Sequence, residues 1–178
     1  MRVTRKQAEL NRQRIIESAI RLFAERGVDG VGVAEVMADA GFTHGGFYNH
    51  FPSKDDLVNE ACKTSFALAV SSLREGNRPL DRLRDDDFGA CLSAAMLSEA
   101  SKGDNARLGT VYNKGVGDLL DVLTERHGDP DHAAAALSCF VGARVLARAV
   151  QRADRNLAEQ FDTVSYPQGA QPRLQASS

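Results

Sequence analysis

Apolar residues recur every three or four positions along most of this chain, and glycine or proline interrupts them at intervals. This period is that of the α-helix, in which residues i, i+3 and i+4 share one face. No segment alternates apolar and polar residues over the length of a strand. The spacing predicts an all-α fold, with helices at about residues 5–26, 33–40, 43–51, 54–75, 88–102, 106–126 and 130–152, and a shorter one around Leu157 and Phe161.

Local signals predict several helix ends. Thr4 and Gln7 have the spacing of a capping box, and Gly27 is expected to end the first helix. Ser53, followed by acidic residues in the next turn, predicts the N-terminus of a long linking helix. The segment 165–178 has two prolines and no apolar period, so we expect it to be disordered.

Two short helices separated by a glycine turn follow the first long one. The second, residues 43–51, stops at a proline, and Phe47 and Phe51 are spaced four apart so that both can anchor it to a core. Two successive glycines in that helix, Gly45 and Gly46, cost roughly 1 kcal/mol each relative to alanine. We therefore expect the backbone there to approach another molecule closely.

Charge is distributed unevenly along the chain. Residues 1–14 hold five Lys or Arg against one Glu, whereas residues 55–178 hold fourteen Lys or Arg against eighteen acidic residues. A basic arm therefore precedes an acidic body. Aromatic residues make up 6% of the chain and tryptophan is absent, which excludes an aromatic platform for unpaired bases. Any contact with nucleic acid is expected at the N-terminal end.

Residues 8–58 resemble the DNA-binding region of the tetracycline-repressor (TetR) family of bacterial regulators. The matching features are an Ala-Gly-Phe turn at 40–42, a helix that closes in Phe-Tyr-Asn-His-Phe at 47–51, and Ser-Lys-Asp-Asp-Leu at 53–57. The resemblance implies a three-helix, helix-turn-helix DNA-binding domain at 1–53 and a helical-bundle domain at 54–164 that binds an effector and dimerises. Val31-Gly32 stands where many members have hydroxyl residues, so we expect helix 33–40 to begin loosely.

This resemblance, with the basic arm, predicts a surface for double-stranded operator DNA. A homodimer that binds a palindromic operator, acts as a repressor and is released by a small-molecule effector is the implied function. The arm (Arg2, Arg5, Lys6, Arg12, Arg14) is expected to meet phosphates. The expected DNA-binding residues are Arg5, Lys6, Val33, Thr43, His44, Gly45, Gly46, Tyr48, Asn49, His50 and Lys54.

Residues 133–150 are apolar nearly all round, which indicates burial on two sides. One side would face the core of the subunit, and the other is predicted to face a second copy of the chain. A central helix buried within one subunit is the alternative. The expected dimer interface comprises Ala136, Phe140, Gly142, Ala143, Ala147, Val150, Leu157 and Phe161.

An apolar stripe on helix 88–102 continues by helical spacing onto Glu99, so this carboxylate is expected to point inward. It would pair with Tyr112, Arg144 or Arg148, or face a cavity; the alternative is a helix end that tilts Glu99 into solvent. The predicted effector pocket comprises Phe88, Cys91, Leu92, Ala95, Met96, Glu99, Tyr112 and Val116.

The stretch His127 to His132 holds two His and two Asp, which invites a metal site, but Asp129-Pro130 is explained as a helix N-cap with proline in the first turn. We expect no metal, no cofactor and no catalytic residues, because no Ser/His/Asp or Cys/His set can be assembled. A thiol- or electrophile-sensing regulator acting through Cys91 or Cys62 stays an alternative. A small helical enzyme or a protein-interaction adaptor is another.

The cysteine pattern and the lack of a long apolar run predict the cellular compartment of the protein. The three cysteines are widely separated and form no Cys-x-x-Cys pair, which is typical of a reducing cytoplasm. No run approaches eighteen consecutive apolar residues, and the basic N-terminus leads into a charged amphipathic stretch. The sequence therefore predicts a cytoplasmic bacterial protein with no membrane partner.

Overall fold

The computed structural model of the chain describes residues 4–75, 96–97, 99–103, 105–151 and 153–162. All regular structure within these ranges is helical, which confirms the predicted all-α class. The helices are α1 (Arg5–Arg26), α2 (Val33–Asp39), the 3₁₀ helix η1 (His44–Asn49), α3 (Lys54–Glu75), α5 (Ala106–His127), α6 (Pro130–Val150) and α7 (Arg155–Asp162). Of the predicted helix 88–102, residues 96, 97 and 99–102 are helical, while Phe88, Cys91, Leu92 and Ala95 lie outside the described residues, as does segment 165–178.

α1 begins and ends where the sequence predicts. The Thr4 hydroxyl accepts a hydrogen bond from the Gln7 backbone N–H at 3.2 Å, and Gly27 ends the helix with a φ of 77°. The capping box is only half formed, because the Gln7 side chain donates to Asn11 at 2.9 Å. An i,i+4 partner therefore replaces the return bond to the cap.

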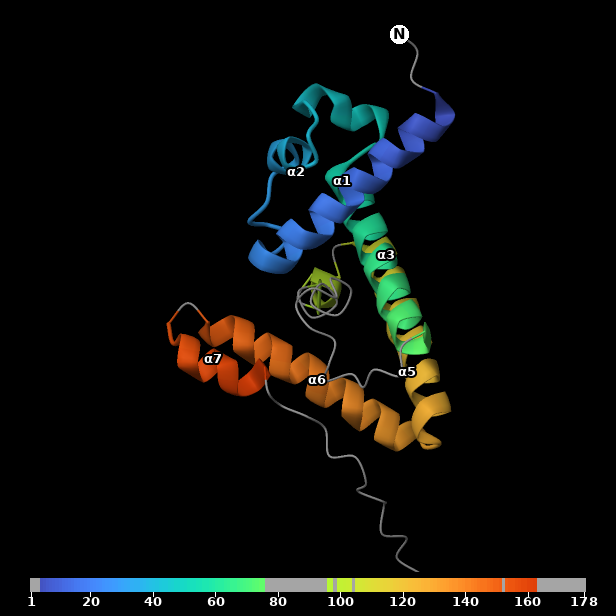
Figure 1. Cartoon of the computed structure of the whole chain (residues 1–178), viewed down its shortest axis with the longest axis vertical. Coiled ribbons are helices and arrows are strands. Elements are labelled where there is room, and N and C mark those ends of the chain that lie inside the picture. Colours follow the sequence, from blue (N-terminus) through green and yellow to red (C-terminus); the bar gives the residue numbers. More distant parts are fainter. Residues whose placement is uncertain (1–3, 76–95, 98, 104, 152, 163–178) are drawn as a thin grey trace, which may run out of the picture.

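The N-terminal domain packs α1 across α2, η1 and the first turns of α3 (Figure 1). Its core holds fully buried side chains from all four elements: Ile15, Phe23, Met37, Phe47, Phe51 and Leu57. The phenylalanines at 47 and 51 stack with ring centroids 5.7 Å apart, so the predicted anchoring of the second short helix is confirmed.

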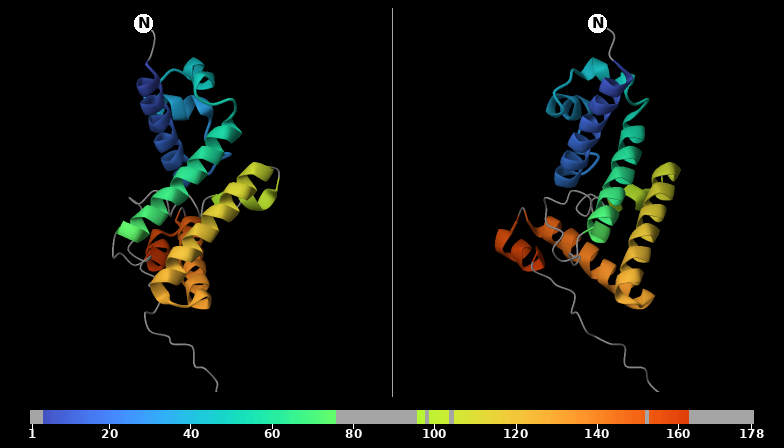
Figure 2. Two further views of the ribbon diagram at one scale, coloured as in Figure 1. Left: turned by 90° about the vertical axis from the view of Figure 1, so that its right-hand side faces the viewer. Right: turned by 45° about the vertical axis from the view of Figure 1, so that its right-hand side comes forward.

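α3 leaves this domain and runs parallel to α5 (Figure 2). At the start of the pair, Arg107 Nη1 lies 2.6 Å from Asp56 Oδ1, and at the end Arg126 Nη2 donates to the Leu73 carbonyl at 3.1 Å. Between these points the Phe66 ring packs against Gly115, which has no side chain to displace it. Leu68, whose spacing places it near the buried stripe of α3, is 49% exposed.

α6 starts at the lower end of α5 and runs away from it toward the other side of the molecule, and α7 packs along its far end (Figure 1). Ala133, Ala136 and Leu137 are buried, while Val145 and Leu146 are 38% and 48% exposed. The helix is long and apolar enough to cross a membrane by length and composition alone, and 22% of its apolar stretch is buried within the chain. The described residues therefore leave part of α6 uncovered, which favours a second copy of the chain over the alternative of a helix enclosed by one subunit.

Candidate nucleic-acid interface

Two short helices, α2 and η1, are joined by a tight turn at Gly41. Gly41 has a φ of 81°, a left-handed conformation that glycine adopts without strain. The Phe42 backbone N–H donates to the Met37 carbonyl at 2.8 Å, which closes the corner. This is the helix, turn and helix that the sequence predicts over residues 33–51.

The second short helix differs from the predicted α-helix, because residues 44–49 form a 3₁₀ helix. Its bonds span three residues: the Gly46 N–H donates to the Thr43 carbonyl at 3.0 Å, and the His50 N–H to the Phe47 carbonyl at 2.8 Å. Two glycines lower the preference for the α-helix, and a six-residue segment is short enough for 3₁₀ geometry.

Polar contacts fix the first turn of α2, so the prediction that this helix begins loosely is wrong. Glu35 Oε2 accepts the Gly32 backbone N–H at 3.0 Å, which is the return half of a capping box. Arg26 Nη2 holds the same carboxylate at 2.8 Å. These two contacts, the backbone bond first, lower the pKa of Glu35 and replace the missing hydroxyl cap.

η1 presents a polar outer face opposite its buried phenylalanine. Thr43, His44, Tyr48 and Asn49 are exposed, and Tyr48 reaches 69% exposure. An added Cβ at Gly45 would meet no atom within 4 Å, and one at Gly46 would make only ordinary contacts with Met37 and Thr43. Nothing within the described chain requires glycine here, so the expected close approach to another molecule stays a prediction.

The basic arm divides into two parts. Arg5 and Lys6 are exposed at the start of α1. Arg12 lies 4.7 Å over the Phe51 ring and pairs with Glu60 at 3.4 Å, while the Arg14 guanidinium lies 5.1 Å over the ring of Phe42. Arg2 lies outside the described residues.

The remaining predicted DNA-binding residues lie nearer the core. Lys54 is half-buried, and its ammonium donates to the Val28 carbonyl at 2.7 Å. Val33 and His50 are also half-buried, and the His50 ring lies 6.4 Å from that of Phe42. Lys54 thus fastens the N-terminus of α3 to the turn after α1, in addition to any contact it makes with phosphate.

An ion pair between Arg21 and Asp39 joins α1 to α2. Arg21 binds Asp39, and hydrogen bonding to that guanidinium lowers the pKa of Asp39 and raises that of Arg21. The pair borders an open groove between α1, α2 and α3, whose lining includes Arg14, Glu17 and Leu68. The sequence did not indicate this groove.

Four of the predicted effector-pocket residues, Met96, Glu99, Tyr112 and Val116, are described in the helical domain. Met96 is fully buried, and Tyr112 and Val116 of α5 are half-buried. The Tyr112 ring meets that of Phe66 edge-on at 5.3 Å. Burial, with a smaller contribution from Cys62, raises the pKa of Tyr112 to about 12.

Glu99 does not make the predicted contacts. Its Oε1 lies 2.7 Å from Lys102 Nζ, and its side chain is 20% exposed. Arg148, one of the expected partners, donates instead to the Ala24 carbonyl. An i,i+3 partner on the same helix satisfies the half-buried carboxylate, so a distant arginine is not required.

The cysteines offer little reactivity where they are described. Cys62 is buried against the α3–α5 contact, and burial raises its pKa to about 12, which leaves a neutral thiol at physiological pH. Cys139 on α6 is half-buried. Sensing through Cys62 is therefore disfavoured, and Cys91 lies outside the described residues.

The turn between α5 and α6 is built as a helix cap. Asp129 Oδ1 accepts the Asp131 backbone N–H at 3.0 Å, and Pro130 occupies the first turn, as predicted. The rings of His127 and His132 lie 4.9 Å apart, and burial, then His132, lowers the pKa of His127. The described residues contain no group of three or more ligands suited to a metal ion.

The residues predicted to form a dimer interface divide by burial. Ala136 and Ala147 are buried within the chain, whereas Leu157 is 37% exposed. The half-buried members are Phe140, Gly142, Ala143, Val150 and Phe161. Exposed Val145 and Leu146 lie on the same helix but were not among the predicted set.

A short helix, a glycine turn and a second short helix with an exposed polar face, on a small core followed by a long linking helix, define a helix-turn-helix DNA-binding protein. Residues 15–61 match the model of the family described as "Bacterial regulatory proteins, tetR family". This N-terminal region is therefore similar to the DNA-binding domain of TetR-family transcriptional regulators.

Curated relatives match over 63 to 71 residues of the chain. The chain is 39% identical over 64 residues to the regulator AcrR of Shigella flexneri, and 33% identical over 63 residues to the regulator YerO of Bacillus subtilis. It is 43% identical over 71 residues to the regulator SAUSA300_2515 of Staphylococcus aureus. These matches cover 36%, 35% and 40% of this chain and only 30%, 22% and 38% of the relatives. The chain therefore spans well under half the length of the curated relatives that it matches.

Solved structures share the fold over nearly the whole chain. The reduced form of NemR from E. coli superposes with a TM-score of 0.61 at 18% identity, covering 89% of this chain and 98% of that one. A protein described as a TetR-family regulator from Mesorhizobium loti superposes with a TM-score of 0.51 at 20% identity, covering 89% and 94%. The N-terminal helix-turn-helix domain with a helical C-terminal domain is thus the family's architecture.

Proposed function

We propose that this chain is a homodimeric repressor that binds a palindromic operator and releases it when a small-molecule effector binds the helical domain. The domain boundaries that we propose are 1–53 for DNA binding and 54–164 for the effector and dimer contacts. The observation that carries the proposal is η1, whose Phe47 is fully buried while Tyr48 and its polar neighbours face outward. Burial on one side fixes the helix, so the other side is free to enter a major groove.

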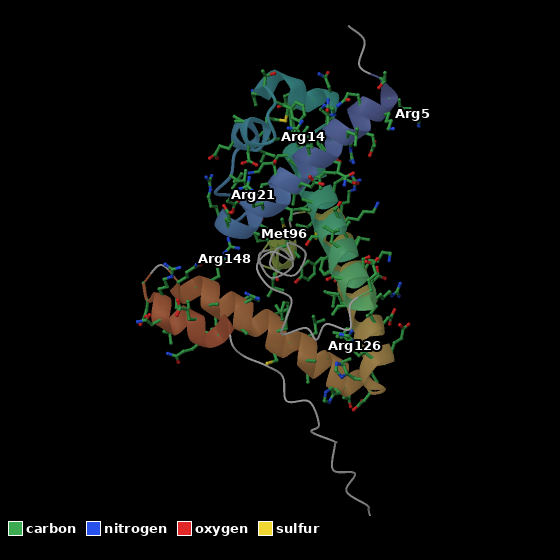
Figure 3. All side chains as sticks on the ribbon, in the orientation of Figure 1. Arg5, Arg14, Arg21, Met96, Arg126 and Arg148 are labelled. Atoms are coloured by element: carbon green, nitrogen blue, oxygen red, sulfur yellow. The ribbon has the colours of Figure 1, made fainter. Side chains whose placement is uncertain are left out.

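Charge supports the same orientation. Arg5 and Lys6 are exposed at the start of α1, and Figure 3 shows Arg5 at the same end of the molecule as the helix-turn-helix. Phosphate contacts by such residues position a protein on the duplex, while side chains of η1 read base edges. The two glycines of η1 would let its backbone lie against the DNA.

A second copy accounts for the apolar side of α6. Val145 and Leu146 are exposed on a helix that is rich in small apolar residues, and Leu157 of α7 is exposed beside it. Two such helices from each subunit would bury these residues in an isologous interface. The dimer would then present two copies of η1 to successive major grooves.

Our proposals for the effector and the cellular compartment are based on the resemblance to the TetR family. Met96 is buried and Tyr112 and Val116 are half-buried, and these are the described positions at which we place the effector. Differential binding of that ligand to two arrangements of α3 would change operator affinity. We place the protein in the bacterial cytoplasm, without enzymatic activity or cofactor.

Selection of bound fragments from random and genomic DNA tests the DNA-binding proposal. We expect one palindromic sequence whose half-sites are spaced by about one helical turn or somewhat more. Tyr48→Ala should weaken binding to it, Tyr48→Phe should separate the ring from the hydroxyl, and Leu68→Ala, an exposed residue on α3, should leave binding unchanged. Recovery of no common sequence, or equal affinity for the Tyr48→Ala and unmodified proteins, would contradict the role of η1.

Sedimentation tests the dimer. Leu146→Glu should produce monomers at micromolar concentration, because it places a charge in the proposed apolar interface. Asn113→Glu, at an exposed position on α5, should stay dimeric. A monomeric unmodified chain would contradict the proposed dimer, and so would a dimer that tolerates Leu146→Glu.

A further inference from the structure

Three cations from different parts of the chain converge on the end of α1. The carbonyl of Val28 accepts from Lys54 of α3 at 2.7 Å, the Asp29 carboxylate binds Lys102 at 3.0 Å, and the carbonyl of Ala24 accepts from Arg148 of α6. We call residues 24–30 the α1–α2 corner. The last carbonyls of a helix lack partners within the helix and carry partial negative charge, so cations stabilise them.

Two of these cations come from the helical domain. Lys102 also holds Glu99 at 2.7 Å, and these two carboxylates raise the pKa of Lys102, while Lys102 lowers the pKa of Asp29. Arg148 lies between α6 and the end of α1, far from Arg5 at the other end of that helix (Figure 3). A Cβ added at Gly27 would lie 3.8 Å from Arg148 Nη2, so the guanidinium spans the corner.

The corner is in turn fastened to the helix-turn-helix. Arg26 Nη2 donates to the Gly30 carbonyl at 2.8 Å and binds Glu35 Oε1 at 2.8 Å. Glu35 accepts the Gly32 backbone N–H, which fixes the first turn of α2, and α2 packs against η1. Polar contacts therefore run from the helical domain through the corner to α2, which packs against the DNA-facing helix η1.

We propose that Lys102 and Arg148 are positioning residues for operator binding, which clamp the α1–α2 corner to the helical domain and so fix the orientation of the DNA-binding domain. The proposal rests on the proposed function, and it assigns an effect on DNA affinity to two residues that lie at the opposite end of α1 from its basic start. A dimer must place two copies of η1 at one fixed separation to bind a full operator. A clamped domain is already in that arrangement, whereas a loose domain visits it for part of the time.

The expected loss of operator affinity follows from the fraction of dimers whose two copies of η1 have the required separation. Apparent affinity falls in proportion to the population that is competent to bind. If release of both clamps leaves roughly one dimer in ten with the required separation, affinity for the full site falls roughly tenfold. Binding of a single half-site needs only one domain and no fixed separation, so it should change less than about twofold by the same reasoning.

The experiment compares full-site and half-site duplexes, taken from the selected palindrome, with the full-length chain. Lys102→Ala and Arg148→Ala are measured singly and together. Lys114→Ala and Arg155→Ala are the matched charge controls, because Lys114 pairs with Asp118, and Arg155 with Glu159, on their own helices. They remove the same charge from the same protein, and thus the same long-range attraction to DNA. Lys102→Arg and Arg148→Lys should restore most of the full-site affinity.

Loss of full-site affinity with retained half-site affinity, in the clamp variants and not in the controls, supports the proposal. Equal loss on both duplexes, equal loss in the controls, or an unchanged or increased full-site affinity overturns it. If the unmodified protein does not prefer a full site to a half-site, the proposed dimeric function fails instead.

A distance measurement tests the clamp without DNA. Spin labels at exposed Ala38 on α2 and exposed Asp121 on α5, in a chain whose cysteines are replaced by alanine, report the orientation of the two domains. The distribution of distances should broaden in the Lys102→Ala/Arg148→Ala chain and stay narrow in the Lys114→Ala/Arg155→Ala chain. An unchanged distribution overturns the proposal whatever the DNA result.

Discussion

Alanine at Gly115 should destabilise the protein, although alanine normally stabilises a helix. Gly115 is buried in the middle of α5, where the Phe66 ring of α3 packs onto its backbone. A Cβ there would lie 2.2 Å from Phe66 Cγ and 2.3 Å from Cδ2. Carbon atoms in contact are normally about 3.5–4.0 Å apart, so the ring or the whole helix must move by more than about 1 Å.

The magnitude follows from two opposed effects. Overpacking a close contact costs about 1–3 kcal/mol, and replacing a helical glycine by alanine returns about 0.5–1 kcal/mol. The net loss at Gly115 should be about 1–2 kcal/mol. Gly117 lies two residues along the same helix, and an added Cβ there would meet nothing within 4 Å. Gly117→Ala should therefore raise the free energy of unfolding by about 0.5–1 kcal/mol.

Thermal and urea unfolding at one fixed protomer concentration measure both variants. The two midpoints should differ by roughly 3–12 °C, with Gly115→Ala the lower, from about 2–4 °C per kcal/mol for a chain of this size. Phe66→Leu combined with Gly115→Ala should be more stable than the sum of the single changes, because the smaller side chain relieves the contact. If Gly115→Ala matches Gly117→Ala in stability, the close packing of α3 on α5 is refuted.

Three further predictions concern single side chains. Cys62 should resist a maleimide at pH 7.5 until the protein unfolds, because it is buried and burial raises its pKa to about 12. Half-buried Cys139 should react sooner. Rapid labelling of Cys62 in the native protein, measured by mass spectrometry, would contradict its buried position. Thr4→Ala should cost about 1 kcal/mol by loss of the α1 cap, with Thr4→Ser retaining most of it, as measured by urea unfolding. The lowered pKa values of Asp39 and Glu35 mean that their contribution to stability is complete above their unfolded pKa values of about 4 and disappears as pH falls through the folded values. Asp39→Asn should therefore flatten the acid limb of a stability-against-pH curve, and an identical limb in that variant would show that the pair with α1 does not contribute.

The N-terminal domain could be predicted from the sequence because its signals are local. Helical period, the cap at Thr4, the end at Gly27 and the paired Phe47 and Phe51 act within a few residues of one another, and the structure confirms each. Period alone did not distinguish an α-helix from the 3₁₀ helix at 44–49. That difference depends on the short length between the Gly41 corner and the proline, and on how the two phenylalanines reach the core.

The contacts that join the two domains were decided by tertiary structure alone. Lys102 meets Asp29 across 73 positions, and Arg148 meets Ala24 across 124, so no spacing rule could have paired them. The same holds for Glu99, whose stripe correctly indicated partial burial but not its partner, and for Gly115, whose meaning depends on Phe66. Sequence determines secondary structure, caps and the polarity of each helix face because these are properties of neighbouring residues. The pairing of faces, charges and helix ends distant in sequence is determined only when the packed helices bring them together.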